Sequence, residues 1–371
     1  MRPTSPNPRR PFSTLFIPLL LALALANCDE TPEPDTIDTP AAMTDESATP
    51  AARTTAPDYA LVIHGGAGTI LKENMTDERA AAITAAMNAA LDTGQAILAG
   101  GGSALDAVEA TIWVLEDSPY FNAGRGAVFT NAGTNEMDAS FMDGSTLNAG
   151  AVGGVTTIKH PISAARAVLE KSEHVLLTGQ GANDFATEQG LETVDPKYFY
   201  TEERYRSLQR ALEGERVEQE KIETSQVYEA IDRKFGTVGC VALDRAGNLA
   251  AGTSTGGMTN KRYNRLGDSP LIGAGTYANN ATCGVSSTGW GEYFIRLAIA
   301  YDVHARMAYG GASLAQAANA VIHESLSATE GTGGIIALDK FGNVAMPFNT
   351  PGMYRGHQVA GEERRIDFYA P

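Results

Sequence analysis

The sequence has few cysteines and few basic residues, and both shortages limit the class of protein it can encode. Its 371 residues include only Cys28, Cys240 and Cys283, so their spacing supports neither a disulfide framework nor a cysteine-rich metal site. Lysine and arginine total 28 against 44 aspartates and glutamates, which gives a formal net charge of −16. Because binding to a phosphate backbone requires a basic surface, we expect no nucleic-acid partner.

Aromatic residues are also scarce, at 7%, whereas glycine (39 residues) and hydrophobic residues (43%) are plentiful. A chain of this length and apolar content can bury a core without disulfides. Abundant glycine favours tight turns and close approaches between backbones. The composition therefore indicates a compact enzyme of helices and strands.

Residues 1–28 have the pattern of an export signal. Three arginines precede an apolar run over residues 15–26, which is too short to predict a membrane span. The run ends in Leu25-Ala26-Asn27-Cys28, which resembles a bacterial lipoprotein box except that Asn27 replaces the usual small residue. We therefore expect an exported, periplasmic protein anchored to a bacterial membrane through lipidated Cys28. The alternative is a conventional signal that is cleaved nearby.

Residues 29–57 are mainly Thr, Pro, Ala, Asp and Glu, with almost no large apolar side chains. Such a segment cannot bury enough apolar surface to offset the entropy of ordering. We expect a disordered tether here, with the folded part beginning at residue 58.

From residue 58 onward, apolar patterns indicate groups of strands and helices. Strands are expected at residues 59–63, 127–129, 136–144, 149–155, 174–178, 238–243, 249–255 and 336–345, the last as a hairpin; helices are expected at 77–98, 103–115, 163–170, 291–308 and 313–327. This order predicts an α+β fold with helices packed on sheets.

Two glycine-rich stretches could carry a ligand. His64-Gly65-Gly66-Ala67-Gly68 follows the first strand but lacks the Lys-Ser/Thr ending of a phosphate loop, and we expect His64 to be structural. In the loop over residues 116–129, several carbonyl groups could point inward toward a cation. The simpler alternative for that loop is a turn into the next strand. We expect no organic cofactor.

Thr237 is the candidate nucleophile. A threonine hydroxyl needs a base, and one base available to it is its own α-amine, whose unperturbed pKa is about 8. Thr237 is internal, so this chemistry requires that the bond between Gly236 and Thr237 be broken. Gly236 has no Cβ and therefore permits a strained backbone at that point.

The segment before Gly236 suits a chain that is cut there. Residues 190–236 are rich in Glu, Lys, Arg and Gln; residues 202–212 can form a helix, but residues 214–225 have little apolar content and are expected to be mobile. We therefore predict one hydrolase domain in two parts, residues 58–236 and 237–371.

Several polar residues after Thr237 could handle an amino-acid substrate. Arg265 could clamp a carboxylate in bidentate fashion, and Asp268 could pair with an α-ammonium group. Thr288 and Gly289 could form an oxyanion site, and Thr255 could hydrogen-bond the nucleophile. Taken singly, each has a plainer explanation, because strand threonines and surface Arg/Asp pairs are common.

A family resemblance runs in order from residue 59 to the C-terminus. The motifs that carry it are His64-Gly65-Gly66-Ala67-Gly68, Phe121-Asn122-Ala123-Gly124, Met142-Asp143-Gly144, Gly236-Thr237-Val238-Gly239, the run from Thr255 to Lys261, the run from Arg265 to Ala278, and Ser287-Thr288-Gly289. Together they resemble the plant-type L-asparaginase and isoaspartyl peptidase family of N-terminal-nucleophile hydrolases.

The resemblance implies a four-layer αββα sandwich and autocatalytic cleavage into an α subunit that ends at Gly236 and a β subunit that begins at Thr237. It also implies a dimer of αβ units. One departure from the family is Arg262-Tyr263-Asn264, where many relatives carry Pro-Gly. This change could alter the rim of the substrate pocket and with it the fine specificity.

The resemblance also implies a role for each matched residue. Thr237 would be the nucleophile and Thr255 its hydroxyl partner. The substrate-binding residues would be Arg265, Asp268, Thr288, Gly289 and Asn122, with Thr288 and Gly289 also forming the oxyanion site and Asn122 acting as a positioning group. A structural sodium ion would be held by the backbone carbonyls of Leu115, Glu116, Ser118, Phe121, Ala123 and Arg125.

We therefore predict an autocleaving threonine hydrolase that removes β-aspartyl (isoaspartyl) residues from dipeptides and hydrolyses L-asparagine to aspartate and ammonia. A sister activity, glycosylasparaginase, is the first alternative, although the Gly-Thr-Val-Gly context disfavours it. A periplasmic protein that binds amino acids without turnover is the alternative from a different class.

Overall fold

The computed structural model describes residues 52–222 and 236–370. The predicted signal, Cys28 and most of the predicted tether lie outside these residues, as does the segment 223–235. The last residues of the predicted tether contact the fold: the Arg53 backbone N–H donates to Asn343 Oδ1 at 2.7 Å, and Arg53 Nη1 donates to the Gly342 carbonyl at 2.8 Å. The folded part therefore begins somewhat before residue 58.

Eight strands form the larger sheet, in the order β12-β11-β1-β5-β6-β2-β3-β4. Neighbouring strands are antiparallel except for β3 and β4, which are parallel. The strands are β1 (Ala60–Gly68), β2 (Met137–Asp143), β3 (Ala149–Val155), β4 (Leu176–Thr178), β5 (Val238–Leu243), β6 (Leu249–Thr255), β11 (Gly352–Val359) and β12 (Arg365–Tyr369).

Strand β1 is buried on both faces of this sheet. Leu61 and Ile63 pack with the helices on one side, while Ala60 and Val62 pack with the second sheet on the other. Burial on both faces explains why the strand has a continuous apolar sequence and not an alternating one.

The second sheet has four antiparallel strands in the order β10-β9-β8-β7. They are β7 (Thr276–Ala278), β8 (Cys283–Gly289), β9 (Gly333–Asp339) and β10 (Val344–Ala345), and the last two form the hairpin predicted near residues 336–345. This sheet packs on β1, β5 and β6 through buried apolar residues such as Val241, Val285 and Ile336.

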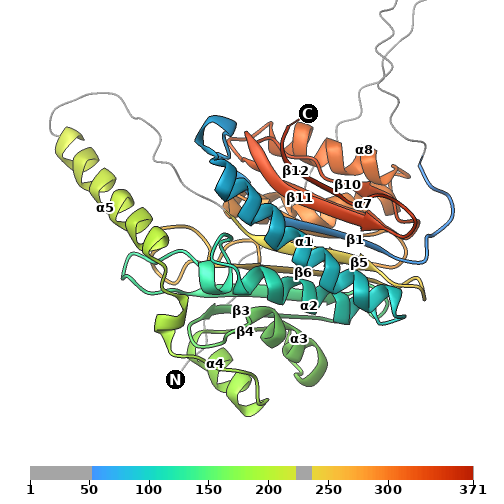
Figure 1. Ribbon diagram of the computed structural model, residues 1–371, viewed down its shortest axis with the longest axis horizontal. Helices are drawn as coiled ribbons and strands as arrows, with labels where there is room; N and C mark the ends of the chain where they lie inside the picture. Colours follow the sequence, from blue (N-terminus) through green and yellow to red (C-terminus); the bar gives the residue numbers. More distant parts are fainter. Residues whose placement is uncertain (1–51, 223–235, 371) are drawn as a thin grey trace, which may run out of the picture. The chain divides into compact units, whose positions relative to one another are not determined.

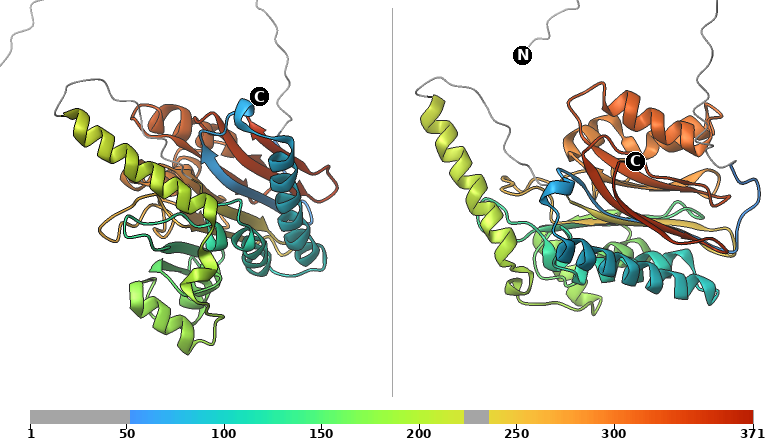
Figure 2. Two further views of the ribbon diagram at one scale, coloured as in Figure 1. Left: turned by 60° about the vertical axis from the view of Figure 1, so that its left-hand side comes forward. Right: turned by 45° about the horizontal axis from the view of Figure 1, so that its top comes forward.

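Helices cover the outer face of each sheet. The larger sheet is covered by α1 (Asp77–Ala99), α2 (Ala104–Asp117) and α3 (Pro161–Lys171); the smaller sheet is covered by α6 (Gly291–Leu297), α7 (Ile299–Ala308) and α8 (Leu314–Asn319). Figure 2 shows the order helices, sheet, sheet, helices in its right-hand view. The predicted four-layer αββα sandwich is confirmed.

Several boundaries differ from the sequence prediction for local reasons. The helix expected at 291–308 is interrupted at Ala298, which adopts a left-handed conformation with φ 49°. Residues 127–129 form no strand, because Phe129 makes only an isolated bridge to Asn135. Beyond α8 the chain continues as a π-helical segment, Ala320–Leu326. Three short 3₁₀ turns lie at Lys72–Asn74, Gly124–Gly126 and Pro196–Phe199, and helix α4 (Gly179–Glu188) packs beside β3 and β4.

Helix α5 (Glu202–Ile222) runs further than the sequence predicted and extends away at one side of the sandwich (Figure 1). The expected helical part ended at residue 212. Glu, Arg, Gln and Lys are good helix formers even without an apolar face, and ion pairs such as Arg206–Glu202 and Arg216–Glu213 support the turns. The predicted mobility of this segment stays a prediction.

Within residues 52–222 and 236–370, no helix combines the length and the apolar character needed to cross a membrane.

Candidate functional site

The Gly236–Thr237 peptide lies at the start of β5, against a distorted part of β1. The pairing of β1 with β11 shifts register between His64 and Gly66. Gly66 has φ +113°, and a Cβ at this position would lie 2.7 Å from Gly236 Cα and 3.3 Å from the Thr237 nitrogen. Only glycine combines this backbone conformation with so close an approach. The glycine-rich part of β1 therefore packs directly against the predicted cleavage point.

Thr237 is buried, and its hydroxyl faces that of Thr255 on the neighbouring strand β6. The Thr237 Oγ1 donates to Thr255 Oγ1 over 3.2 Å, and Thr255 Oγ1 also accepts the backbone N–H of Gly257 at 3.0 Å. Thr255 Oγ1 thus accepts two hydrogen bonds, one from the nucleophile and one from the backbone that holds it in place. The structure brings these two predicted residues together.

Asn122 holds the backbone beside the nucleophile. Its Nδ2 donates to the Gly257 carbonyl at 2.7 Å, its Oδ1 accepts the Val128 N–H at 2.9 Å, and its backbone carbonyl accepts the Gly256 N–H at 3.0 Å. These contacts are all to the chain itself, which suits the predicted positioning role. A direct contact between Asn122 and substrate stays a prediction.

Thr288 and Gly289 lie at the end of strand β8, next to the distorted part of β1 that carries Gly66. The Thr288 Oγ1 accepts the Ala67 backbone N–H at 3.1 Å and is completely buried. Because the hydroxyl oxygen receives this hydrogen bond, its own proton is available for another acceptor. A hydroxyl and a backbone amide at this place could stabilise an oxyanion formed above Thr237.

Arg265 and Asp268 lie on either side of Gly291, at the first residue of α6. A Cβ on Gly291 would come 2.7 Å from Asp268 Oδ1 and 2.8 Å from Arg265 Nη2. Arg265 also forms a bidentate ion pair with Glu292, through Nε at 2.9 Å and Nη2 at 2.8 Å. The Nε and Nη2 edge of the guanidinium is therefore directed at Glu292, which the sequence analysis did not foresee. A substrate carboxylate would approach a guanidinium that is already held in place.

The Asp268 carboxyl group has a strongly raised pKa. Burial raises its pKa from 3.8 to about 7, although the nearby Arg265 guanidinium opposes the shift. Its Oδ2 is buried and has no hydrogen-bond partner within the described part of the chain. An α-ammonium group would supply the hydrogen-bond donor that this atom lacks.

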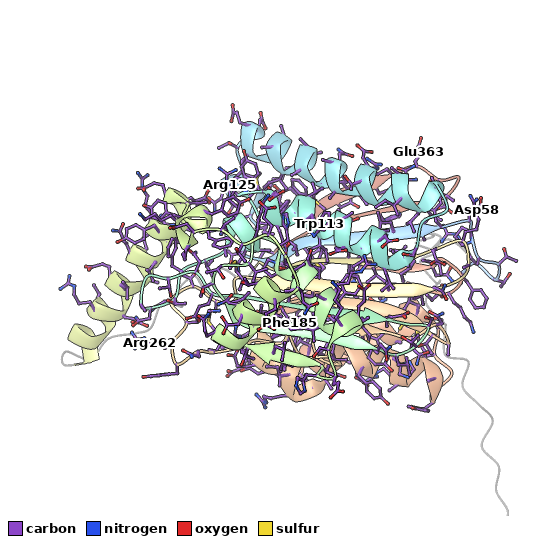
Figure 3. All side chains as sticks on the ribbon, turned by 90° about the horizontal axis from the view of Figure 1, so that it is seen from below. Asp58, Trp113, Arg125, Phe185, Arg262 and Glu363 are labelled. Atoms are coloured by element: carbon purple, nitrogen blue, oxygen red, sulfur yellow. The ribbon has the colours of Figure 1, made fainter. Side chains whose placement is uncertain are left out.

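The rim loop after Thr255 contacts helix α5. Glu215 on α5 accepts Asn260 Nδ2 and Arg262 Nη2, each at 2.7 Å. Figure 3 shows Arg262 beside the end of this helix, and Tyr263 next to it is 95% exposed. The residues that depart from the family pattern therefore lie at the surface, and one of them, Arg262, contacts the helix that precedes the cleavage point.

The loop predicted to hold sodium has room for converging carbonyl groups. A Cβ on Gly124 would overlap the Glu116 carbonyl oxygen, and one on Gly126 would overlap the Phe121 carbonyl oxygen. Two other predicted carbonyls are hydrogen-bonded in the loop: Leu115 accepts the Ser118 N–H, and Ala123 accepts the Gly126 N–H. Backbone carbonyl oxygens are hard donors of the kind that a small cation takes, and the sodium site stays a prediction.

The Glu116 side chain has a separate function in the core. Its Oε1 accepts the Ser254 hydroxyl at 2.6 Å and the Ile162 N–H at 3.1 Å. Burial raises the pKa of this carboxyl group to about 8, while the Ser254 hydrogen bond lowers it. The cation loop and the strand that carries Thr255 are thereby linked.

Comparison with known proteins gives this geometry a family. The model of the asparaginase family matches residues 57–366, which is most of the chain. The chain belongs to the asparaginase family. The resemblance inferred from the motifs is therefore confirmed, and with it the N-terminal-nucleophile type of fold.

Relatives of the asparaginase family cover nearly the whole folded part. The chain is 50% identical over 309 residues to an isoaspartyl peptidase of Salmonella typhimurium, a match that covers 83% of this chain and 98% of the relative. It is 51% identical over 310 residues to an isoaspartyl peptidase of Escherichia coli, with 83% and 95% covered. A plant-type L-asparaginase of Pyrococcus horikoshii is 43% identical over 306 residues, with 82% and 97% covered.

The sequence analysis did not identify three polar residues of this asparaginase-family site. Glu292 holds Arg265, while Ser286 and Thr253 belong to a buried chain of hydrogen bonds that reaches Thr237 through His64. A signal was present for two of them. Alternate residues on a strand share a face, so Thr253 lies on the face of Thr255 and Ser286 on the face of Thr288.

Proposed function

We propose that this chain is a threonine hydrolase that cleaves itself before Thr237, releases β-aspartyl residues from dipeptides and hydrolyses L-asparagine. The observation that carries the proposal is the pairing of the Thr237 and Thr255 hydroxyls at 3.2 Å beside a peptide that lies on Gly66. Relatives named isoaspartyl peptidase and L-asparaginase, at 40% identity and above, support the same activity.

The first step would be self-cleavage. The Thr237 hydroxyl oxygen attacks the Gly236 carbonyl carbon, the bond to the Thr237 nitrogen breaks, and that nitrogen takes up the proton that the hydroxyl group gives up. The product is an ester between the Gly236 carboxyl group and the Thr237 hydroxyl group. Water hydrolyses this ester and leaves a free hydroxyl and a free α-amine on Thr237.

The second step would be substrate hydrolysis. The α-amine takes the hydroxyl proton as Thr237 Oγ1 attacks the side-chain carbonyl carbon of the substrate. The Thr288 hydroxyl and the Gly289 N–H would donate to the oxyanion. The leaving amine takes the proton from the α-ammonium group, and water then attacks the resulting ester to release aspartate and restore Thr237.

Binding would depend on the amino-acid head of the substrate. The substrate α-ammonium group would supply the partner that Asp268 Oδ2 lacks, and the α-carboxylate would bind the Arg265 guanidinium. Both β-aspartyl dipeptides and asparagine carry this head, so one clamp serves both substrates. The leaving group differs between them and would lie outside the clamp.

A sodium ion would stiffen the loop that presents Asn122. The carbonyl groups of Leu115, Glu116, Ser118, Phe121, Ala123 and Arg125 would hold it, as the family resemblance implies. The ion supplies only electrostatic attraction for these oxygens.

Denaturing electrophoresis and kinetics test the proposed function together. The purified protein should separate into two fragments, the second with Thr237 as its first residue, whereas Thr237→Ala should stay as one band. A wild-type chain that stays whole on long incubation would contradict the proposal and favour amino-acid binding without turnover. Rates on β-Asp-Leu, L-asparagine and a glycosylated asparagine then rank the substrates, and the dipeptide should be hydrolysed fastest. A preference for the glycosylated asparagine would indicate the sister activity.

We also propose that the enzyme works as a dimer of αβ units, tethered in the periplasm through lipidated Cys28. The support is the family resemblance and the N-terminal sequence pattern. Sedimentation of the purified enzyme tests the assembly. Labelling with a fatty-acid analogue, compared between wild type and Cys28→Ala, tests the anchor.

A further inference from the structure

A chain of buried polar side chains begins at the nucleophile and runs between the two sheets. His64 Nδ1 lies 2.9 Å from the carbonyl oxygen of Thr237, and His64 Nε2 lies 3.0 Å from Ser286 Oγ. The Ser286 Oγ in turn lies 2.6 Å from Thr253 Oγ1. His64, Ser286 and Thr253 have no exposed surface.

The same chain continues to the substrate clamp. Thr253 Oγ1 contacts Thr276 Oγ1, and Thr276 Oγ1 lies 2.7 Å from Ser140 Oγ. The Ser140 hydroxyl donates to the carbonyl of Ser269 at 2.6 Å, and Ser269 directly follows Asp268. A series of buried polar contacts thus leads from the nucleophile to the backbone next to the clamp residue Asp268.

The chemistry of the acceptors decides which histidine nitrogen carries the proton. A backbone carbonyl can only accept, so Nδ1 of His64 must be the protonated nitrogen. Nε2 must then accept the Ser286 hydroxyl proton, which leaves the Ser286 oxygen to accept from Thr253. The Thr253 contact with Ser286, at 2.6 Å, is shorter than its contact with the Gly275 carbonyl, at 3.2 Å, which agrees with this direction. Burial lowers the pKa of His64 to about 3, although its hydrogen bond to Thr237 opposes the shift, so the ring stays neutral.

The imidazole ring is also confined sterically. A Cβ on Gly239 would overlap both Ser286 Oγ and His64 Nε2. These two atoms therefore fill the space that a side chain at residue 239 would occupy, and the ring cannot move toward β5. The glycine two residues after the nucleophile is required by the network.

Holding the Thr237 carbonyl has a particular effect on a residue that becomes an N-terminus. After cleavage Thr237 has a peptide bond on one side only, and β5 begins at Val238. The hydrogen bond to the carbonyl oxygen holds the peptide plane that contains Thr237 Cα and the Cα–C bond. It therefore fixes the position and the axis from which the α-amine and the side chain project, while the contact of Oγ1 with Thr255 restricts rotation about that axis.

We propose that His64 is a positioning residue for Thr237, held in its Nδ1–H form by Ser286 and Thr253, so that it orients the nucleophile and its amine together. This inference rests on the proposed function of Thr237. It differs from the sequence expectation, in which His64 was only structural, because it predicts an effect on turnover beyond any effect on stability.

Ser286→Ala tests the proposal, with Thr282→Val as a matched control. Thr282 lies between β7 and β8, at the opposite end of β8 from Thr288, and its Oγ1 makes a buried hydrogen bond of 2.6 Å to His304 Nδ1 on α7. In cleaved enzyme, Ser286→Ala should lower kcat for β-Asp-Leu about tenfold with KM within about twofold, because a misaligned nucleophile costs rate and not binding. Thr282→Val should lower the melting temperature by a similar amount and leave kcat within about twofold.

The kinetic outcomes decide between positioning and plain structure. A Ser286→Ala enzyme with kcat within twofold of wild type, or a control that loses as much kcat, overturns the proposal. If Ser286→Ala does not fold, Thr253→Val replaces it, with a smaller loss of kcat in the same direction. His64→Asn, whose amide can still donate to the Thr237 carbonyl, should retain more activity than His64→Ala. Equal losses in these two variants would also overturn it.

A spectroscopic arm keeps this inference separate from the proposed function. Nitrogen NMR of the full-length enzyme labelled at histidine, with His64 identified by its absence in His64→Asn, should show a neutral ring protonated on Nδ1 at pH 6. A ring protonated on Nε2, or an imidazolium at that pH, overturns the inference whatever the activity. A wild-type enzyme without turnover would contradict the proposed function and leave this spectroscopic result to decide the tautomer.

Discussion

Replacing Asp268 by asparagine should abolish activity and at the same time stabilise the fold at alkaline pH. The carboxyl group is buried, its Oδ2 has no partner within the described residues, and burial raises its pKa from 3.8 to about 7 against the opposing effect of Arg265. A raised pKa means that the folded state binds the proton more tightly than the unfolded state does. The resulting stability is present below pH 3.8 and is lost as the pH rises toward 7.

The size of the effect follows from the shift. Each pKa unit corresponds to about 1.4 kcal/mol, so the ionised carboxylate costs the fold roughly 4 kcal/mol well above pH 7. At pH 5 the same cost is roughly 1.7 kcal/mol, because the group is mostly protonated in the folded state. An uncharged asparagine carries neither cost. The stability difference between Asp268→Asn and its parent should therefore grow by roughly 3 kcal/mol between pH 5 and pH 8.5.

Urea unfolding at the two pH values measures this difference. Both proteins carry Thr237→Ala, so that each unfolds as one uncleaved chain. Asp184→Asn makes the same change of charge at an exposed position of α4 and should show little pH dependence. A difference for Asp268→Asn that is constant with pH would refute the reasoning, and so would an Asp268→Asn enzyme that retains full activity with Thr237 intact.

Three further changes test other contacts. Glu292→Gln removes the charge that holds Arg265. We expect KM for β-Asp-Leu to rise about fivefold with kcat nearly unchanged, because a partly exposed ion pair contributes about 1 kcal/mol or less. An unchanged KM would contradict this role of Glu292. Lys261→Met removes the ion-pair partner of the buried Asp138 carboxylate, which lies 4.0 Å from Lys261 Nζ. The free energy of unfolding should fall by about 3–5 kcal/mol, and most of this loss should be recovered in the double variant that also carries Asp138→Asn. Glu215→Ala removes the contacts between α5 and the rim loop. The melting temperature should change little, while proteolysis within α5 should become faster. An unchanged rate of proteolysis would show that these contacts do not hold the helix.

The sequence predicted much of the fold because its local signals agree with one another. The apolar run of β1 and the helices α1 and α2 follow directly from spacing, and in the structure Ser103 caps α2 by accepting the Asp106 N–H. The interruption at Ala298 was not predictable, because an alanine with φ 49° is imposed by packing and not by its own preference. The extension of α5 was missed because the prediction required an apolar face, which this charged helix does not need over its length.

The motifs identified the main residues of the candidate site, but they did not reveal the contacts that hold those residues in place. Thr237, Thr255 and Thr288 were identified because a family resemblance marked them. In the structure Thr255 contacts Thr237, and both Thr237 and Thr288 lie against the distorted part of β1 around Gly66. Glu292 was missed because an acid at the start of a helix is common, and nothing in one sequence shows that it faces Arg265. Ser286 was missed because a serine in a strand has a structural explanation until its partners are known.

The polar groups of this site explain why one enzyme would accept leaving groups as different as ammonia and an amino acid. Asp268 Oδ2 has no hydrogen-bond partner within the described residues, and Arg265 is held by Glu292. Under the proposed function these two residues would bind the amino-acid head, and the buried contacts from His64 to Ser269 would link that binding to the position of Thr237. Recognition and attack would then depend on parts of the substrate that do not include the leaving group. The departures at Arg262 and Tyr263 lie on the exposed rim, where they can alter the preference for a leaving group without disturbing this alignment.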